Sequence, residues 1–184
     1  MKRILAALLA EKDPGLARSL DYSYPSLIAQ LLSGIRQMEL DVYANSKGGR
    51  YADPQGPRWA AEAGFPADPP PYPKGVMEAA GFKILHMQDV DYASNCQPFR
   101  ACLEEVRRWS DSHPGHLPIF LLIETKAPDG KWKWDSARGE PFTSETLDRL
   151  DEVIRSVFSP DRLITPDDVR GEAATLDEAV RGEH

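Results

Sequence analysis

The chain has 184 residues, a length typical of one domain, and 41% of them are hydrophobic, so it can bury a core. Its net charge of -7 at pH 7 argues against general nucleic-acid binding, and no apolar run is long enough to span a bilayer. The 13 glycines and 16 prolines predict many turns and irregular loops.

The start of the chain, MKRILAALLAEKD, has some features of an export signal. Two basic residues precede an apolar run over residues 4–10, but the run is short and charged residues follow it without a clear cleavage site. The larger apolar side chains share one helical face, and Pro14 and Gly15 would end such a helix. We therefore expect an amphipathic helix rather than a signal peptide.

The next elements are helical and lead into a strand. Residues 16–21 are expected to close the first helical segment, and apolar spacing predicts a helix over residues 25–33, with Ser23 as a candidate cap. The segment GIRQMELDVYA, residues 34–44, is then predicted to be a β-strand.

This predicted strand carries two acids on one face. Residues two apart in a strand point the same way, so Glu39 and Asp41 lie together near its end. The other face is apolar and is expected to pack under a helix: Met38, Leu40 and Val42. Two adjacent carboxylates repel each other, and a hard cation, a shared proton or a basic neighbour would relieve this. The alternative is a solvated pair, which the apolar surroundings disfavour.

Residues 45–81 show little regular pattern, and we expect a functional loop that folds over another part of the molecule. The segment FKILHM, residues 82–87, is predicted to be a second strand that delivers His86 at its end. Asp89 and Asp91 are interpreted as loop-forming acids, and the alternative is that they touch the site.

A helix is predicted over residues 99–109; Cys96 lies just before it and Cys102 lies within it. Cys96 and Cys102 would either form a small disulfide loop in an oxidising compartment or stay as two reduced, buried thiols. No second Cys or His pair lies at ligand spacing, which argues against a zinc site.

The segment LPIFLLIETK, residues 117–126, is predicted to be a third strand. Its near-continuous apolar run is typical of a parallel strand covered on both faces. It ends in Glu124 and Lys126, which share a face. The remaining predicted elements are a helix over 144–158, a fourth strand over 161–164 and a helix over 175–181.

Helices and strands alternate along the chain, which predicts a parallel α/β fold with right-handed crossovers. Polar side chains follow the ends of three strands, where active sites of β/α barrels and open α/β sheets collect. The set comprises Glu39, Asp41, His86, Glu124 and Lys126.

These five residues suit phosphodiester chemistry. Three carboxylates favour a hard cation such as calcium or magnesium, His86 could act as general acid or base, and Lys126 could hold a phosphate. Each residue alone also has a simpler explanation: His86 as a hydrogen-bonded structural histidine, and Glu124 with Lys126 as an ion pair. Their joint placement favours the functional interpretation.

Three segments, MELDVY, ILHMQDVDY and PIFLLIETK, resemble the calcium-dependent phosphoinositide-specific phospholipase C family in its bacterial-type form. The flanking segments SYPSLIAQLLSGIRQMELDVYANSKGGRYA, CLEEVRRWSDSHPGHLPIFLLIETK and SPDRLITPDDVRG are similar to that family as well. The resemblance implies a TIM-type (β/α) barrel, with the chain forming one partial barrel domain over residues 1–184. In this family the inositol 2-hydroxyl attacks the phosphorus and releases diacylglycerol, which gives a cyclic inositol phosphate.

The resemblance also implies roles for individual residues. Glu39, Asp41 and Glu124 match calcium ligands, His86 matches one of two catalytic histidines, and Lys126 matches a residue that contacts the substrate phosphate. The substrate would be a phosphoinositide or related phosphodiester at a membrane surface. The family's first strand ends in a His-Asn-Ser-Tyr type segment, which supplies the other histidine and an asparagine ligand, and the chain has none before Leu16.

We therefore expect a barrel truncated at both ends, with weak or absent turnover and open sheet edges that favour self-association. Two other functions remain open: a glycerophosphodiester phosphodiesterase and a non-catalytic calcium- or phosphate-binding remnant. A glycosidase using Glu39 and Glu124 would leave Asp41 and Lys126 without a role. The paired cysteines and the family favour a secreted or periplasmic location.

Overall fold

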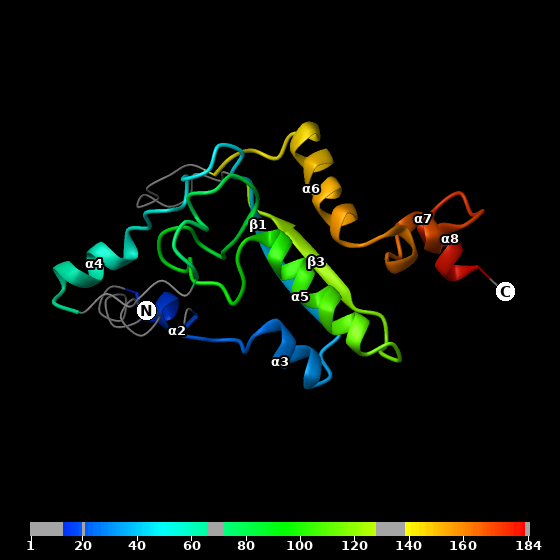
Figure 1. Ribbon diagram of the computed structural model, residues 1–184, viewed down its shortest axis with the longest axis horizontal. Helices are drawn as coiled ribbons and strands as arrows, with labels where there is room; N and C mark the ends of the chain where they lie inside the picture. The colour runs from blue at the N-terminus through cyan, green and yellow to red at the C-terminus, as the bar shows by residue number, and fades with distance from the viewer. Residues whose placement is uncertain (1–12, 20, 66–71, 128–138, 183–184) are drawn as a thin grey trace.

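The computed structural model of the protein describes residues 13–19, 21–65, 72–127 and 139–182 (Figure 1). Its centre is a three-stranded sheet in the order β2-β1-β3. The strands are β1 (Gln37–Tyr43), β2 (Lys83–Ile84) and β3 (Phe120–Thr125). β1 and β3 run parallel, while β2 pairs antiparallel with β1. The protein is thus a mixed α/β structure with a small open sheet, an arrangement compatible with part of a barrel.

One face of the sheet is covered by helices. These are α3 (Leu27–Leu32), α5 (Phe99–Ser112) and α6 (Ser144–Val157), with α5 packed against both α3 and α6. Figure 1 shows α5 lying along β1 and β3. The predicted alternation in β1 is confirmed, since Met38, Leu40 and Val42 are buried in this core and Glu39 is exposed on the other face.

The capping residues of the helices explain where they begin. The hydroxyl of Ser26, and not that of Ser23 as expected, accepts a hydrogen bond from Ala29 N at the start of α3. Thr143 caps α6 in the same way through Thr146 N. Both α5 and α6 are confirmed close to their predicted bounds because each carries an apolar stripe at helical spacing.

The prediction that β3 is covered on both faces is wrong. Phe120 is 66% exposed and Leu122 is 54% exposed. Both lie on the side of the sheet away from the helices, because the residues that alternate with them, Leu121 and Ile123, pack against the core. The apolar run of β3 therefore predicted burial of both faces, but no described residue covers the face with Phe120 and Leu122. Self-association through the open sheet edges stays a prediction.

The prediction of parallel pairing for the second strand is also wrong. Only Lys83 and Ile84 form β2, and they pair antiparallel with Tyr43 and Val42. On the far edge of β2, the side-chain amide of Gln97 both accepts from Ile84 N, at 3.1 Å, and donates to Ile84 O. One side chain thus takes the hydrogen bonds that a further strand would make with Ile84.

No strand forms over residues 161–164, where a fourth was predicted. Pro160 opens a 3-10 helix, η1 (Pro160–Arg162), and Thr165 caps α7 (Pro166–Arg170) in a reciprocal capping box with Asp168. These two local signals leave too few residues between them for a strand. α7 packs with α8 (Leu176–Arg181), the predicted last helix, at one end of the molecule beyond α6 (Figure 1).

Two further elements differ from expectation. Pro14 does not end a helix but begins α2 (Pro14–Ser19), where proline at the first helical position loses no hydrogen bond. The long segment after β1 contains α4 (Gly56–Glu62). As expected, this segment also folds over other parts of the molecule, because Tyr51 and Met77 pack with Leu85 and Tyr92 in a second apolar cluster. Residues 1–12, with the predicted amphipathic helix, and residues 128–138 lie outside the described residues.

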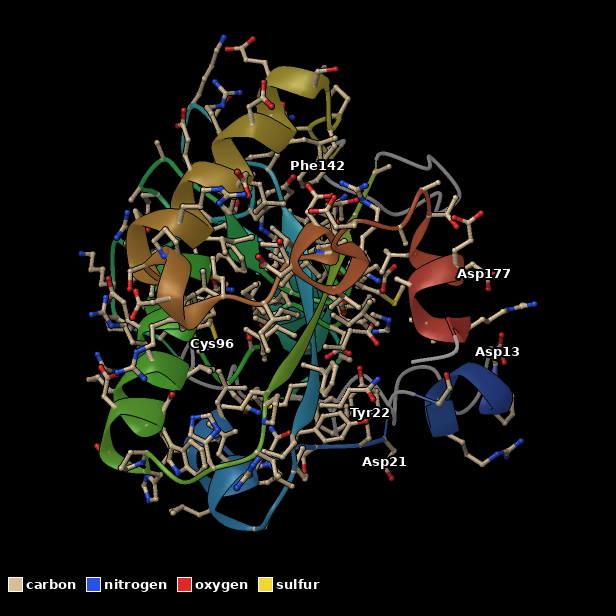
Figure 2. The ribbon with its side chains drawn as sticks, turned by 90° about the vertical axis from the view of Figure 1, so that its right-hand side faces the viewer. Asp13, Asp21, Tyr22, Cys96, Phe142 and Asp177 are labelled. Atoms are coloured by element: carbon tan, nitrogen blue, oxygen red, sulfur yellow. A yellow bond between two sulfur atoms is a disulfide. The ribbon has the colours of Figure 1, made fainter. Side chains whose placement is uncertain are left out.

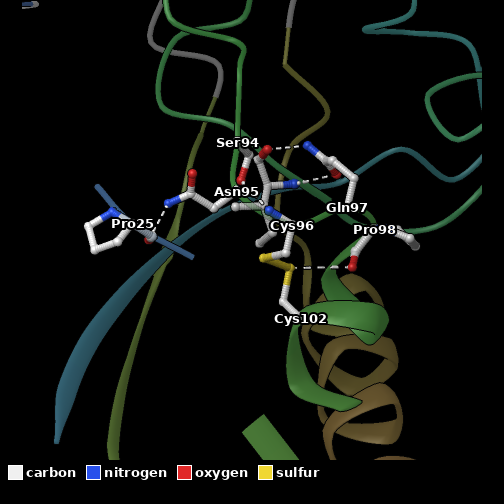
Figure 3. Close-up of a disulfide and its surroundings, with 8 residues drawn as sticks. Pro25, Ser94, Asn95, Cys96, Gln97, Pro98 and Cys102 are labelled. Carbon is white, nitrogen blue, oxygen red and sulfur yellow. Dashed lines mark hydrogen bonds between the residues drawn. A yellow bond between two sulfur atoms is a disulfide. The ribbon is translucent and has the colours of Figure 1, made fainter. Parts of the chain in front are cut away.

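The two cysteines form a disulfide. Cys96 and Cys102 are joined across the junction between the segment after β2 and the first turn of α5 (Figure 3). Figure 3 also shows the neighbouring Asn95, whose side-chain amide donates to the carbonyl oxygens of Tyr24 and Pro25 at 3.0 and 2.8 Å. The segment before α3 is thereby fastened to the disulfide loop. Among the described residues, no helix is long and apolar enough to cross a membrane.

Candidate active site

The register of β1 and β3 brings three carboxylates together. Asp41 is the register partner of Glu124, and Glu39 lies two residues before Asp41 on the same face. One carboxylate oxygen from each of the three residues lies within 4.8 Å of the other two. Oxygen atoms at this spacing can share one hard cation, which would remove their mutual repulsion.

Lys126 extends the cluster. Its ammonium lies 2.7 Å from Glu124 Oε1 and 3.3 Å from Asp41 Oδ1. The backbone places it there, because Lys126 N donates to Val42 O and so continues the pairing of β3 with β1. Burial lowers the pKa of Lys126. The hydrogen bond with Glu124 and the negative charge of Asp41 outweigh this effect, so the pKa of Lys126 lies above its usual value. Lys126 is therefore charged at neutral pH.

The two paired acids have opposite electrostatic environments. Burial, followed by a hydrogen bond with Glu124, raises the pKa of Asp41 to about 6. Two carboxyls can hydrogen-bond to each other only when one carries a proton. The Lys126 ammonium lowers the pKa of the more exposed Glu124. Without a cation, a proton shared between these acids relieves part of their repulsion.

The donor set fits a calcium ion. Calcium prefers oxygen ligands, including carboxylates, in flexible geometry. Asp41 Oδ1 is buried and accepts no hydrogen bond of good geometry, although Lys126 Nζ lies 3.3 Å away. A buried carboxylate oxygen without a directed donor is left short of a partner that a cation could provide.

His86 lies beside this cluster. Leu85 N donates to Asp41 O at 3.2 Å, so the chain passes next to the end of β1 just before the histidine. His86 Nδ1 is 3.0 Å from Asp91 Oδ2 and 3.1 Å from the Tyr22 hydroxyl oxygen. The hydrogen bond with Asp91 is the largest cause of a raised pKa at His86, partly offset by burial.

Glu39, Asp41 and His86 line one cavity of about 1180 Å³ together with Tyr22 and Asp91. Figure 2 shows Tyr22 close to the sheet, on the segment between α2 and α3. The cavity thus presents two acids of the candidate metal cluster and a histidine to the same volume. Its size suits a small-molecule head group.

A family model described as "Phosphoinositide phospholipase C, Ca2+-dependent" matches residues 1–184, the whole chain. The chain belongs to this family. No curated protein and no solved structure matches it. The Ca2+-dependent phosphoinositide phospholipase C family is a family of hydrolases, so the family supports an enzyme that uses calcium and a phosphoinositide substrate. The carboxylate cluster is the candidate calcium centre of this family member.

The predicted site residues of this phospholipase C family member lie close together. Glu39, Asp41, Glu124 and Lys126 form one cluster, and His86 shares a cavity with two of them. The family match does not assign a role to any of these residues, so their functions remain predictions.

Two further residues contact His86. Tyr22 was not predicted at this site, and contact of Asp91 with the site was the alternative to its interpretation as a loop-forming acid. The interpretation holds for Asp89, whose carboxylate accepts from Gln55 N at 2.9 Å. Asp91 lies five residues after His86, and this spacing alone does not predict a contact between the two side chains. The contact depends on the chain reversal between Met87 and Asp91.

Proposed function

We propose that this chain is a calcium-dependent phosphoric diester hydrolase that cleaves inositol phospholipids to diacylglycerol and an inositol phosphate. The observation that carries the proposal is the convergence of Glu39, Asp41 and Glu124 on one point beside a cavity that also contains His86. The family match supports both the reaction class and the metal.

In this proposal Glu39, Asp41 and Glu124 hold the calcium ion. When bound, the ion supplies positive charge that stabilises negative charge developing on the phosphate oxygens. Lys126 adds a second positive charge and would contact a non-bridging phosphate oxygen. In the structure the Lys126 ammonium contacts Asp41 and Glu124. The proposal therefore requires the ammonium to give up one of these contacts when it binds the phosphate.

His86 would move the protons. Its Nδ1 faces Asp91 and Tyr22, which leaves Nε2 to accept a proton from the attacking hydroxyl or to donate one to the leaving group. Among the described residues that line the cavity, His86 is the one histidine. We expect weak turnover, because one residue then has to serve both steps.

The test is the release of diacylglycerol from phosphatidylinositol vesicles, with calcium or with a calcium chelator. We expect release only with calcium, and a rate at least about 10-fold lower for Glu124→Gln, because losing even the outer partners of metal ligands typically costs roughly 10- to 100-fold. Glu172→Gln, at an exposed position away from the site, is the matched control. Calcium-independent release would contradict the proposal.

The same assay distinguishes the other functions. Hydrolysis of glycerophosphoinositol without action on the lipid would indicate a glycerophosphodiester phosphodiesterase. Calcium binding without hydrolysis of either compound would indicate a non-catalytic calcium-binding remnant. We also propose a secreted or periplasmic location, which the Cys96–Cys102 disulfide supports because such bonds persist in oxidising compartments.

A further inference from the structure

We propose that Asp91 and Tyr22 are positioning residues for His86, which fix the proton on Nδ1 and present Nε2 to the cavity. The inference rests on the proposed function, in which His86 transfers protons, and adds two residues to it. It is carried by a closed set of contacts: Asp91 Oδ2 lies 3.0 Å from His86 Nδ1 and accepts a 2.5 Å hydrogen bond from the Tyr22 hydroxyl.

Asp91 is held rigidly. Its backbone N donates to Met87 O at 2.9 Å, and its carbonyl oxygen accepts from His86 N and Met87 N at 3.2 and 3.1 Å. The residue is 3% exposed. A buried carboxylate needs donors, and the Tyr22 hydroxyl and the His86 ring supply them. The turn over residues 86–91 therefore brings the acid to the ring in one fixed geometry.

This geometry selects one tautomer of the neutral imidazole. An ionised carboxylate only accepts hydrogen bonds, so the histidine nitrogen that faces it must carry a proton. That nitrogen is Nδ1, and Nε2 is then the unprotonated atom. A base with its lone pair on Nε2 can accept a proton from a hydroxyl group held in the cavity.

Tyr22 joins the pair from a distant part of the chain, 64 residues before His86. Burial, followed by the bond to Asp91, raises the pKa of Tyr22, so its hydroxyl stays a donor at neutral pH. The Tyr22 hydroxyl donates its proton to Asp91. The lone pairs of the hydroxyl oxygen are then free to accept from His86 Nδ1, which lies 3.1 Å from that oxygen. Both partners of His86 Nδ1 therefore act as acceptors, and both favour the same tautomer.

The position of Tyr22 is itself fixed. Its ring packs against that of Tyr24, with centroids 5.4 Å apart, and Asn95 holds the carbonyl oxygens of Tyr24 and Pro25 (Figure 3). The other charged groups that act on His86 are Asp41 and Lys126, whose effects on its pKa oppose each other. Asp91 is thus the carboxylate in direct contact with the ring.

The experiment measures the tautomer of His86 by nitrogen-15 NMR of the chain labelled at histidine, with His86→Gln to assign the signals. At a pH where the ring is neutral, we expect the wild type to carry the proton on Nδ1. Asp91→Asn and Tyr22→Phe should each shift a measurable fraction to the Nε2 tautomer. The matched controls are Asp89→Asn, a buried acid of the same loop that bonds the Gln55 backbone, and Tyr24→Phe.

Unchanged tautomer populations in both Asp91→Asn and Tyr22→Phe, with folding confirmed by circular dichroism, would overturn the inference. This readout does not depend on turnover, so it decides the inference even if the chain fails to hydrolyse phosphatidylinositol. In an active chain, we also expect Asp91→Asn to lower kcat while KM stays the same, because the residue would position the base without touching the lipid.

Discussion

Asp41 on β1 and Glu124 on β3 are register partners in parallel strands, and Lys126 lies between their carboxylates. The two acids are 83 positions apart in the sequence, and the strand pairing places them side by side. The ammonium compensates for part of their negative charge. The cluster can therefore exist without a metal and still keep carboxylate oxygens for one.

Lys126→Met separates the two roles of this lysine. Because the ammonium competes with a cation for the Asp41 and Glu124 carboxylates, its removal should tighten calcium binding several-fold. The same change removes the proposed phosphate contact, so KM for phosphatidylinositol should rise. Calorimetry and vesicle hydrolysis measure the two effects. Lys74→Met, at an exposed loop position, is the control. Weaker calcium binding in Lys126→Met would mean that the lysine organises the acids rather than competing for them.

Asp41 should destabilise the chain at neutral pH when calcium is absent. Its pKa is about 6 in the folded chain against 3.8 ordinarily, so the folded state binds more protons between these values. The stability that the protonated acid contributes is full below pH 3.8 and is lost as the pH rises through 6. After allowance for solvent screening, Asp41→Asn should stabilise by about 1 kcal/mol at pH 7.5.

Urea unfolding of wild type and Asp41→Asn with a calcium chelator, at pH 4 and pH 7.5, measures this effect. The difference between the two proteins should be larger at pH 7.5. A variant that is less stable than wild type at pH 7.5 would show that Asp41 makes a structural bond that its asparagine cannot replace.

Lys83 carries a buried ammonium in β2. Its side chain is fully buried, and Nζ has no hydrogen-bond partner among the described residues. Burial lowers the pKa of Lys83, partly offset by Glu78. Replacing it with methionine removes a buried charge that Glu78 offsets only in part, so Lys83→Met should stabilise the chain by about 1 kcal/mol at pH 7.

The pH dependence gives a second check on Lys83. A lowered pKa means that the folded state binds fewer protons than the unfolded state in the window below 10.5, so wild-type stability gains as the pH rises through that window. The advantage of Lys83→Met should therefore shrink between neutral pH and pH 10. Thermal unfolding at several pH values tests this, and a strongly destabilised variant would indicate that the ammonium has a partner in the folded protein.

Much of the site could be predicted from the sequence because it depends on strand periodicity. The alternation in β1 predicted both the buried face and the shared face of Glu39 and Asp41, and the same rule placed Glu124 with Lys126. The joint placement of these residues depended on parallel pairing of β1 and β3, which the structure confirms. Helices α5 and α6 followed from strong apolar stripes.

The features that could not be predicted depend on contacts between distant or locally irregular segments. The antiparallel pairing of β2 is accompanied by the Gln97 amide on its edge, which has no sequence signature. The contacts of Tyr22 and Asp91 with His86 need the turn after β2 and the crossing of the segment before α3. The apolar run of β3 predicted burial, yet Phe120 and Leu122 are exposed.

The Cys96–Cys102 disulfide should stabilise the loop that borders the cavity. Linking residues this close in the sequence contributes roughly 2 kcal/mol by restricting the unfolded chain. We expect Cys96→Ser with Cys102→Ser to lower the free energy of unfolding by about that amount, measured by urea denaturation without reductant. Wild type with reductant should match the double variant. Equal stability of the oxidised and reduced wild type would contradict the prediction.

The most direct test of the account is a calcium titration by calorimetry on this chain, with Asp41→Asn for comparison. The account predicts saturable binding of one ion that Asp41→Asn abolishes, because Glu39, Asp41 and Glu124 present their oxygens within 4.8 Å of one another. Absence of binding to the wild type, or equal binding by the variant, would contradict the proposed calcium centre and with it the proposed calcium-dependent catalysis by this chain.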